Sequence, residues 1–352
     1  MIFRVGGIAM KASIIGATGY TGAELIRLLI YHPKVDLEII TSRSFVGEKI
    51  SDIYPNLTEI IDDKCEELDV ERIAQETEVA FTALPHGVSM DIVPKLIARG
   101  LKVIDLSGDY RYQDLATYQH WYEEHSSAEL LEQGTYGLAE LNLLQIKQSS
   151  LIANPGCYPT ASLLALLPLV QNSIVEKEGI IVDAKSGTTG AGRKLSRGTH
   201  FSETEGNFKA YKVANHRHRS EIEEKLSLSQ TEGVEVTFTP HLLPVKRGIL
   251  ATIYADLAED MSKGELLHYY HESYQGADFV RVLDEKLPQL KYVVGSNYCD
   301  IGLKVDQERN KVIIISAIDN LVKGSAGQAI QNLNLMSGWD ETTGLEQIGL
   351  YL

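Results

Sequence analysis

The residues best suited to chemistry lie in one short stretch, Asn154-Pro155-Gly156-Cys157-Tyr158-Pro159-Thr160. The brief apolar run 151–153 predicts the end of a buried strand, and the longer run 161–167 predicts a buried helix. Pro159 suits the first turn of this helix, because a missing N–H costs nothing there. We therefore expect Cys157 at the mouth of a helix, where free N–H groups and the positive dipole end favour an anion. A thiol so placed is a candidate nucleophile, although many free cysteines are merely small buried side chains.

A second candidate group is the histidine pair His216 and His218. Histidine titrates near neutral pH and suits proton transfer. The two side chains would share a face of an extended segment and diverge in a helix. We favour His216 as the acid–base group and His218 as a phosphate-binding or orienting group. His-x-His can also chelate zinc, but no further ligand stands at a convincing spacing, so no metal site is expected.

Composition limits the class of protein. The chain has 352 residues, 44% hydrophobic and 23% charged, which is typical of a soluble globular protein with two domains. Its three cysteines are widely spaced, which excludes a disulfide framework and indicates a reducing compartment, so a cytoplasmic location is expected. Cys65 and Cys299 are interpreted as structural. Residues 1–9 lack the apolar core of a secretion signal and are interpreted as an upstream extension or tag remnant.

The charge distribution points to an anionic small molecule. The net charge of −15 argues against binding to nucleic acid or to an anionic membrane. One region, 185–219, reverses the sign, with eight basic residues against two acids. We expect this basic region to face an anionic ligand. Its basic members are Lys185, Arg193, Lys194, Arg197, Lys209, Lys212, Arg217 and Arg219.

A nucleotide-binding pattern opens the chain. A strand at 11–15 is followed at once by Gly16-Ala17-Thr18-Gly19-Tyr20-Thr21-Gly22 and then by an apolar helix. Glycines in this place let the backbone approach a pyrophosphate at the helix N-terminus. A second strand, 37–41, leads into Ser42-Arg43-Ser44. Because an arginine rather than an acid follows this strand, NADP is favoured over NAD.

Strands and helices alternate through the first half of the chain. Buried runs at 79–84 and 103–107 flank a helix at about 89–99, which predicts a parallel, doubly wound sheet. These strands should end at Pro85 and Ser107 on the ligand-binding edge. The second half groups its strands together, at 180–184, 234–238, 249–257 and 312–318, and predicts an α+β domain with a mainly antiparallel sheet. Ser220 is expected to cap a helix through residue 226, and a last helix is expected over 320–336.

Five motifs, in this order, resemble the N-acetyl-γ-glutamyl-phosphate reductases, an arginine-biosynthesis family related to aspartate-semialdehyde dehydrogenase. The resemblance covers residues 11–352. Arg219-Ser220 stands where the family is expected to have a proline, which affects helix entry and not chemistry. The motifs are Gly16-Ala17-Thr18-Gly19-Tyr20-Thr21-Gly22, Ser107-Gly108-Asp109-Tyr110-Arg111, Asn154-Pro155-Gly156-Cys157-Tyr158-Pro159-Thr160, Ser186-Gly187-Thr188-Thr189-Gly190-Ala191-Gly192-Arg193 and His216-Arg217-His218.

The resemblance implies a Rossmann-type NADP-binding domain, 10–156, completed by the C-terminal segment 320–352. The α+β domain, 157–319, would carry the catalytic groups and the subunit contacts of a homodimer or homotetramer. Cys157 and His216 are the expected catalytic residues, and Arg111, Asn154, Lys212 and His218 are expected to bind the acyl-phosphate substrate. The residues expected to bind NADPH are Gly16, Thr18, Gly19, Tyr20, Thr21, Ser42, Arg43, Ser44, Pro85, Ser107, Gly187 and Asn320.

The implied reaction begins with attack of a thiolate on the γ-carbonyl and loss of phosphate. Reduction of the thioester by NADPH then gives a thiohemiacetal, which releases the semialdehyde. Three alternatives stay open. A lysine-pathway reductase would act on an acyl phosphate one carbon longer, and the motifs do not separate the two. A short-chain reductase would need a Tyr-x-x-x-Lys pair, which the sequence lacks. A redox-sensing regulator would bind NADP without turnover.

Overall fold

The computed structural model describes residues 9–228 and 230–352. The expectation for the N-terminal extension therefore falls, apart from residue 9, outside the described residues. The chain forms two compact units. The first comprises residues up to 155 together with 325–346, and the second comprises 156–324 together with 347–352.

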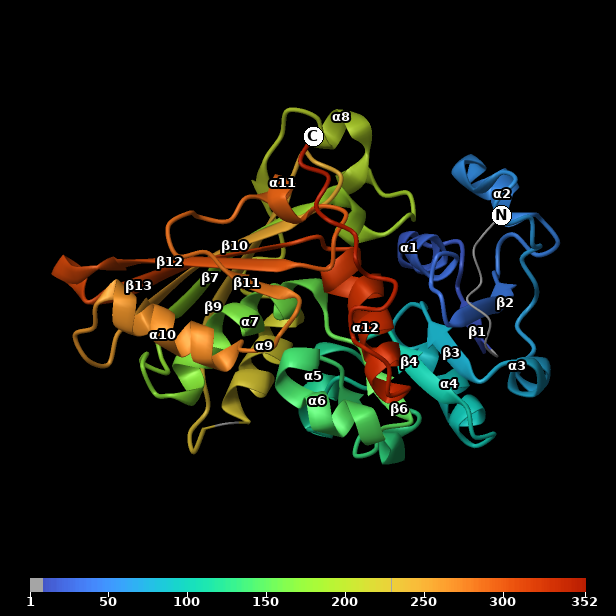
Figure 1. Ribbon diagram of the computed structural model, residues 1–352, viewed down its shortest axis with the longest axis horizontal. Helices are drawn as coiled ribbons and strands as arrows, with labels where there is room; N and C mark the ends of the chain where they lie inside the picture. Colours follow the sequence, from blue (N-terminus) through green and yellow to red (C-terminus); the bar gives the residue numbers. More distant parts are fainter. Residues whose placement is uncertain (1–8, 229) are drawn as a thin grey trace. The chain divides into compact units, whose positions relative to one another are not determined.

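The first unit is built around a parallel six-stranded sheet with strand order β2-β1-β3-β4-β6-β5 (Figure 1). This confirms the doubly wound α/β prediction. The strands are β1 Met10–Ile15, β2 Val35–Thr41, β3 Val79–Thr82, β4 Lys102–Asp105, β5 Thr135–Tyr136 and β6 Leu151–Ala153. The helices are α1 Tyr20–Leu29, α2 Ile50–Ile53, α3 Val70–Glu76, α4 Ser89–Ile97, α5 Leu115–Trp121, α6 Ala139–Gln148 and α12 Gly327–Met336.

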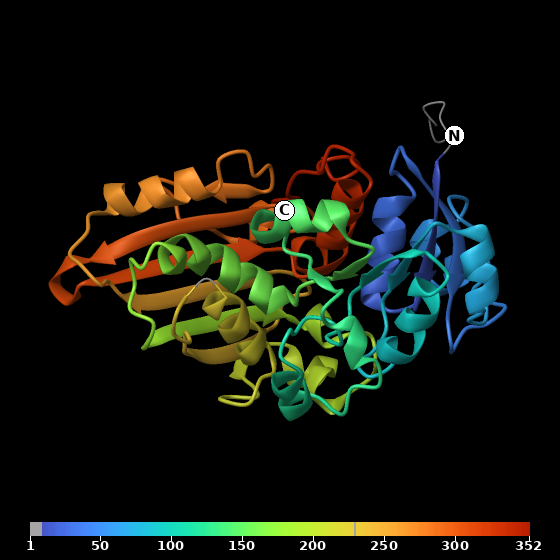
Figure 2. The same ribbon diagram turned by 90° about the horizontal axis from the view of Figure 1, so that it is seen from below.

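Helices cover both faces of this sheet. Ile15, Ala80 and Val103 share a buried core with residues of α3 and α4. Alternate side chains such as Phe81 and Ile104 are also fully buried and project to the opposite face, because successive strand residues alternate. The helices α1 and α12 contact each other and lie on that face (Figure 2). Burial on both faces accounts for the nearly continuous apolar character of β3 and β4.

The second unit contains a seven-stranded sheet with order β11-β12-β13-β10-β7-β9-β8. Four of its pairings are antiparallel and two, β7 with β9 and β11 with β12, are parallel, which confirms the mainly antiparallel prediction. Helices α7, α9 and α10 lie on one side of the sheet (Figure 1). The strands are β7 Ile180–Gly187, β8 Lys209–Ala210, β9 Val236–Leu243, β10 Ile249–Asp256, β11 Val280–Val282, β12 Cys299–Asp306 and β13 Lys311–Ile318. The helices are α7 Cys157–Gln171, α8 Phe201–Thr204, α9 His218–Ser227, α10 Lys263–Ser273 and α11 Leu290–Val293.

Helix α7 is the buried centre of the second unit. Every residue from 158 to 170 is buried, as expected for a helix that is apolar all round. Pro168 lies inside the helix and has no N–H to donate to the carbonyl of Leu164. The hydroxyl of Tyr274 donates to this carbonyl instead. The proline therefore leaves no unsatisfied group at this point of the core.

Three local predictions differ from the structure. Helix α9 starts at His218 with Arg217 as its N-cap, so Ser220 lies inside the helix, where its hydroxyl donates to the Arg217 carbonyl. The last helix starts at Gly327 and is preceded by a π-helix, Val322–Ala326. Residues 320–324 and 347–352, which the sequence placed with the first domain, belong to the second unit. The backbone N–H of Leu350 donates to Val294 O there, at 2.9 Å.

The turn between β1 and α1 depends on two of its three glycines. Gly16 has a φ of +94°, and a Cβ on it would lie 2.4 Å from the Ala83 carbonyl oxygen. A Cβ on Gly22 would lie 2.5 Å from the Gly16 carbonyl oxygen. At Gly19, the N-cap of α1, the nearest atom to a Cβ is 3.7 Å away. Protein packing thus requires glycine at the first and third positions and leaves room at the second.

We expect Gly16→Ala to lower stability by about 1–3 kcal/mol, because it combines an unfavourable φ with a backbone clash. This corresponds to a fall in the thermal unfolding midpoint of roughly 2–10 °C. Gly19→Ala is the matched control and should unfold within about 2 °C of the wild type. Thermal unfolding followed by circular dichroism measures both. Equal destabilisation by the two substitutions would contradict this account of the turn.

Candidate active site

Cys157 is the first residue of α7 and is partly exposed. Gly156 is the N-cap and supplies no side chain. The carboxylate of Glu221, which is fully buried in α9, accepts the backbone N–H of Gly156 at 2.9 Å. This contact fixes the turn that carries Cys157 to α9, the helix that begins at His218. Glu221 was not predicted as a site residue, because an acid on a helix is usually exposed and no local pattern marks it as buried.

Aromatic rings surround His216 and His218. His216 is 8% exposed, and its ring centroid lies 5.6 Å from that of Tyr158, 5.6 Å from that of Tyr211 and 5.4 Å from that of Phe238. The His216 and His218 centroids are 4.9 Å apart. The structure therefore brings both histidines to the residue that follows Cys157. Tyr158 and Tyr211 were not predicted as site residues.

The two tyrosine hydroxyls lie close to each other, and both interact electrostatically with Cys157. Their oxygens are 3.2 Å apart. Burial raises the pKa of Tyr211 to about 12, and the negative charge of Cys157 adds to the rise. Burial raises the pKa of Tyr158 as well, with further contributions from Tyr211 and Cys157. Both phenols are thus neutral near pH 7, and the Tyr158 hydroxyl also donates to the His241 carbonyl at 3.3 Å.

Burial also controls the charge of His216. It lowers the pKa of this imidazole to about 3, and the positive charges of Lys212 and Arg217 lower it further. The ring is therefore neutral near pH 7. Its Nδ1 accepts the backbone N–H of His218 at 3.2 Å. Because that backbone group can only donate, the proton of the neutral ring lies on Nε2.

Four of the eight cations of the basic region fall into two sets. Lys185 pairs with Asp183 at 2.7 Å and Arg219 with Glu223 at 2.9 Å, so these two cations serve the fold. Lys212 and Arg217 act on His216 through their charges. Lys212 is exposed and has a φ of +46°, in the left-handed region that is unfavourable for a residue with a side chain. The strained segment before His216 thus carries a cation predicted to bind substrate.

The predicted nucleotide-binding residues of the first unit gather around the start of α1. Tyr20 is the first residue of this helix. The Thr18 hydroxyl lies 2.9 Å from that of Ser42, which also accepts the Ser44 backbone N–H at 3.3 Å. The Thr21 hydroxyl lies 3.3 Å from that of Ser325. Arg43 is exposed beyond the end of β2 and, within the described ranges 9–228 and 230–352, its side chain forms no hydrogen bond or ion pair.

Two buried aspartates, Asp105 and Asp109, form hydrogen bonds that connect the segments after β3 and β4. Ser107 donates to Asp105 at 2.5 Å and accepts the Asp109 backbone N–H at 3.0 Å. Asp109 in turn accepts the Gly87 backbone N–H with both oxygens, at 3.0 Å. The turn that begins at Pro85 is thus tied to the end of β4. Ser107 was predicted to bind the cofactor, and its side chain takes part in this network within the protein.

Two predicted substrate-binding residues of the first unit also support the backbone. Arg111 is buried, and its guanidinium donates to the carbonyls of Asn154 at 2.7 Å and Leu106 at 3.0 Å. These carbonyls stand just beyond β6 and β4. Asn154 donates to Ser325 O at 3.1 Å and accepts from Asn332 at 3.1 Å. Both side chains therefore fix the chain immediately before the Gly156–Cys157 turn.

Gly187 and Asn320, predicted for cofactor binding, lie in the second unit. A Cβ on Gly187 would lie 2.6 Å from Lys246 O, so glycine is needed there for close packing. The Asn320 side chain accepts the Gly248 N–H at 2.7 Å and donates to the Thr189 hydroxyl at 3.0 Å. Among residues 9–228 and 230–352, no group of three or more metal-ligating side chains is found. No helix of the same described ranges is long and apolar enough to cross a membrane.

Comparison with protein families matches both units. Residues 11–149 match the semialdehyde dehydrogenase NAD-binding domain, and residues 157–320 match the semialdehyde dehydrogenase dimerisation domain. Among solved structures, aspartate semialdehyde dehydrogenase II from Vibrio cholerae, complexed with ASA, has a TM-score of 0.71 at 16% identity, covering 94% of this chain and 99% of that one. Aspartate semialdehyde dehydrogenase with NADP from Candida albicans has a TM-score of 0.65 at 19% identity, covering 94% and 98%. These structures share the fold.

Curated relatives are much more similar in sequence. N-acetyl-γ-glutamyl-phosphate reductase from Acetivibrio thermocellus is 53% identical over 344 residues, covering 97% of this chain and 99% of the relative. The protein of the same name from Halothermothrix orenii is 52% identical over 345 residues, with the same coverage. Identity at this level over almost the full length confirms the resemblance found in the sequence. The chain belongs to the N-acetyl-γ-glutamyl-phosphate reductase family.

Proposed function

We propose that the chain catalyses the NADPH-dependent reductive dephosphorylation of N-acetyl-L-glutamyl 5-phosphate to N-acetyl-L-glutamate 5-semialdehyde, a step of arginine biosynthesis. The observation that carries the proposal is Cys157 at the start of a fully buried helix, in a chain 53% identical to a reductase of this name. The Glu221 contact to Gly156 holds this turn, and the aromatic group around His216 begins at the next residue, Tyr158.

The first unit fits a dinucleotide. Its first and third glycines allow the backbone to pack closely, and Gly19 lies at the helix start, where a pyrophosphate is expected and where a Cβ would meet no closer atom than the Gly16 carbonyl oxygen at 3.7 Å. NADPH would be held here by the turn from Gly16 to Thr21 and by Ser42, Arg43 and Ser44. When bound, it supplies the hydride for the reduction. Arg43 is exposed beyond β2, where a 2′-phosphate is expected, which supports NADP over NAD.

In the proposed reaction, the Cys157 sulfur attacks the acyl carbon and phosphate leaves, so that a thioester forms on the enzyme. After reduction, Cys157 carries a thiohemiacetal, whose collapse releases the aldehyde and restores the thiol. The phenols of Tyr158 and Tyr211 are neutral near pH 7, so they add no negative charge that would oppose a thiolate at Cys157. Lys212 is exposed, and its positive charge can attract the anionic substrate.

His216 is assigned to the oxygen of the thiohemiacetal. Its proton lies on Nε2, and a neutral imidazole can stabilise an oxyanion as a hydrogen-bond donor. Negative charge that develops on this oxygen favours the protonated ring, so His216 can exchange a proton when the charge appears. His218, the first residue of α9, is assigned an orienting or phosphate-binding role.

The second unit also suggests the subunit contact. Side chains on β7, β10 and β13 that alternate with the core, such as Ile181, Tyr254 and Ile315, are exposed or half-buried. We propose that this face joins copies of the chain in a homodimer or homotetramer, which fits the dimerisation domain matched at 157–320. A monomer in sedimentation equilibrium would contradict it.

The three free thiols favour a cytoplasmic location, which cell fractionation tests.

The decisive experiment is the reverse reaction. We expect phosphate-dependent reduction of NADP⁺ by N-acetylglutamate semialdehyde, followed by absorbance of the nicotinamide. The semialdehyde one carbon longer, from the lysine pathway, should react at least tenfold more slowly. A preference for the longer substrate would reassign the pathway. NADP binding without turnover of either substrate would overturn the proposed enzyme activity.

Cys157→Ser should keep the fold and NADPH binding and lose nearly all turnover, because a serine hydroxyl is not ionised near neutral pH. The measurement is the reverse assay together with NADPH titration by fluorescence. Cys299→Ser is the matched control, since Cys299 is a fully buried thiol on β12. It should keep turnover within about threefold. Activity of Cys157→Ser within tenfold of wild type would end the covalent mechanism.

Arg43→Ala should raise KM for NADPH by roughly tenfold or more and leave KM for NADH nearly unchanged, because a lost guanidinium affects only the 2′-phosphate. Steady-state kinetics with both cofactors measures the difference. Lys49→Ala, an exposed cation that pairs with Asp62, is the control for a general loss of charge. If NADPH and NADH suffer equally, Arg43 has no role at the 2′-phosphate.

His216→Asn should lower turnover by roughly 10²–10⁴-fold, the usual size for a positioned acid–base group. His218→Asn should mainly raise KM for phosphate in the reverse assay. Kinetics in both directions separates the two roles. The opposite result, with turnover lost in His218→Asn alone, would exchange the assignments.

The burial of His216 also predicts a pH effect on stability. In the unfolded chain histidine binds a proton near pH 6.5, whereas in the folded protein His216 does so only near pH 3. Its contribution to stability is therefore complete above about pH 6.5 and is lost as the pH falls towards 3, by about 1.4 kcal/mol per pH unit. In urea unfolding, His216→Asn should show a shallower loss of stability below pH 6.5 than His218→Asn does. Equal slopes would contradict the low pKa.

A further inference from the structure

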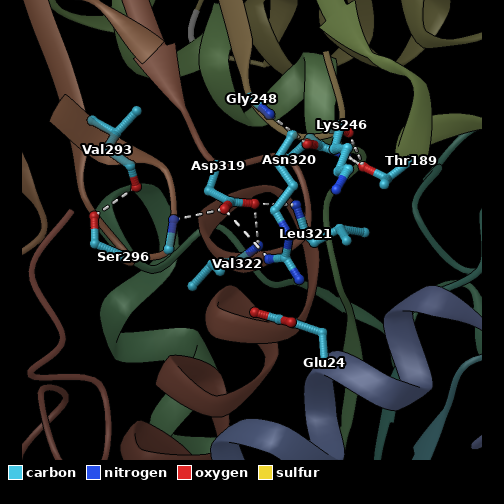
Figure 3. Close-up of polar contacts among 12 residues, drawn as sticks. Glu24, Thr189, Lys246, Gly248, Val293, Ser296, Asp319, Asn320, Leu321 and Val322 are labelled. Atoms are coloured by element: carbon cyan, nitrogen blue, oxygen red, sulfur yellow. Dashed lines mark hydrogen bonds and ion pairs between the residues drawn. The ribbon is translucent and has the colours of Figure 1, made fainter. Parts of the chain in front are cut away.

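Two consecutive buried side chains follow β13 and hold several backbone segments of the second unit. Asp319 is fully buried and Asn320 is 2% exposed. Figure 3 shows their contacts, which radiate to the turn before β10, to the segment after α11 and to the chain that enters the π-helix. Buried polar groups are costly unless they are fully hydrogen-bonded, so such a cluster defines one backbone arrangement.

Asp319 fixes the turn that follows it. One carboxylate oxygen accepts the backbone N–H groups of Leu321 at 2.8 Å and Val322 at 3.2 Å. The other accepts the Gly295 N–H at 2.8 Å and faces an Arg247 nitrogen at 3.4 Å. The Asp319 carbonyl also accepts the Gly324 N–H at 3.0 Å. This last bond spans five residues, which is the spacing of a π-helix, a form often found at functional sites.

The π-helix packs directly on the proposed nucleophile. A Cβ built on Gly324 would lie 2.8 Å from Cys157 Cβ and 3.2 Å from Cys157 Cα. A Cβ there would also lie 3.1 Å from Ile318 Cδ1. The backbone at Gly324 thus forms one wall beside the first residue of α7, and only glycine permits this approach.

Asn320 extends the cluster to the loop that follows β7, residues 188–193. It joins the Gly248 N–H to the Thr189 hydroxyl, and Thr189 donates in turn to Lys246 O at 2.6 Å. The loop is thereby fixed to the same strand end as the π-helix. The polar atoms of Asn320 are engaged inside the protein, which makes it a structural counterpart of Asp319.

We propose that Asp319 is a positioning residue for the reaction at Cys157: it holds the π-helix so that Gly324 forms the wall that places the sulfur. The proposal rests on the proposed function for its kinetic readout, while the reactivity of the thiol tests it separately. Asparagine is the informative replacement, because both carboxylate oxygens of Asp319 face N–H donors. In either orientation the amide nitrogen would face such a donor, and two donors cannot pair.

In Asp319→Asn we expect kcat to fall roughly 10–100-fold, with KM for NADPH within twofold of wild type. Alkylation of Cys157 by iodoacetamide at pH about 7.5, followed by peptide mass spectrometry, should slow at least fivefold. The matched control is Asp300→Asn, which removes another buried aspartate–arginine pair on the neighbouring strand, between Asp300 and Arg281 at 2.6 Å. This control should keep both the kcat and the alkylation rate within twofold.

Gly324→Ala keeps Asp319 and alters the wall itself, so it tests the proposal even if Asp319→Asn does not fold. It should reproduce the loss of kcat and the slower alkylation. Wild-type kcat and alkylation in either folded variant would overturn the proposal, as would equal losses in Asp300→Asn. If the wild-type chain lacks reductase activity, the proposed function fails, and the alkylation rates alone then decide the role of Asp319.

Discussion

The placement of one sulfur at the start of a fully buried helix is the constraint on which the second unit depends. Helix α7 has no exposed face, so its first turn must be held by groups inside the protein. The carboxylate of Glu221 does this by accepting the Gly156 N–H. A buried carboxylate without such a donor would be very unfavourable. The same contact therefore satisfies the acid and fixes the residue before Cys157.

Close approach of backbones is the second constraint. In the first unit, Gly16 and Gly22 let the β1–α1 turn pack closely against backbone carbonyl groups. In the second unit, Gly187 and Gly324 allow close contact with Lys246 and Cys157. At each of these positions a Cβ would lie 2.8 Å or less from another atom. A methyl group at any of these positions would therefore force neighbouring atoms to shift. Gly19 differs because its free space faces no protein atom within 3.7 Å.

Burial and function act on His216 in opposite directions. Enclosure by aromatic rings lowers the pKa of the imidazole to about 3, which keeps it neutral. The contact from the His218 N–H then places the remaining proton on Nε2. In the proposed reaction, proton exchange by His216 would consequently depend on negative charge that appears only during turnover. The environment of His216 thus keeps the ring without a positive charge near pH 7 and leaves Nε2–H as a hydrogen-bond donor.

The sequence by itself determined the class of both units, the glycine-rich turn, the helix start at Cys157 and the family. Those features depend on local periodicity and on motifs that occupy consecutive residues, such as 154–160. Only the tertiary structure assigned Glu221, Tyr211 and Asp319 their places, because their partners lie 65, 53 and 24 residues away along the chain. It also moved Ser220 from a helix cap into the helix interior and showed that the Asn320 side chain supports a loop. Hydrogen bonds between distant segments leave no periodic trace in the sequence, and for that reason folding alone decides them.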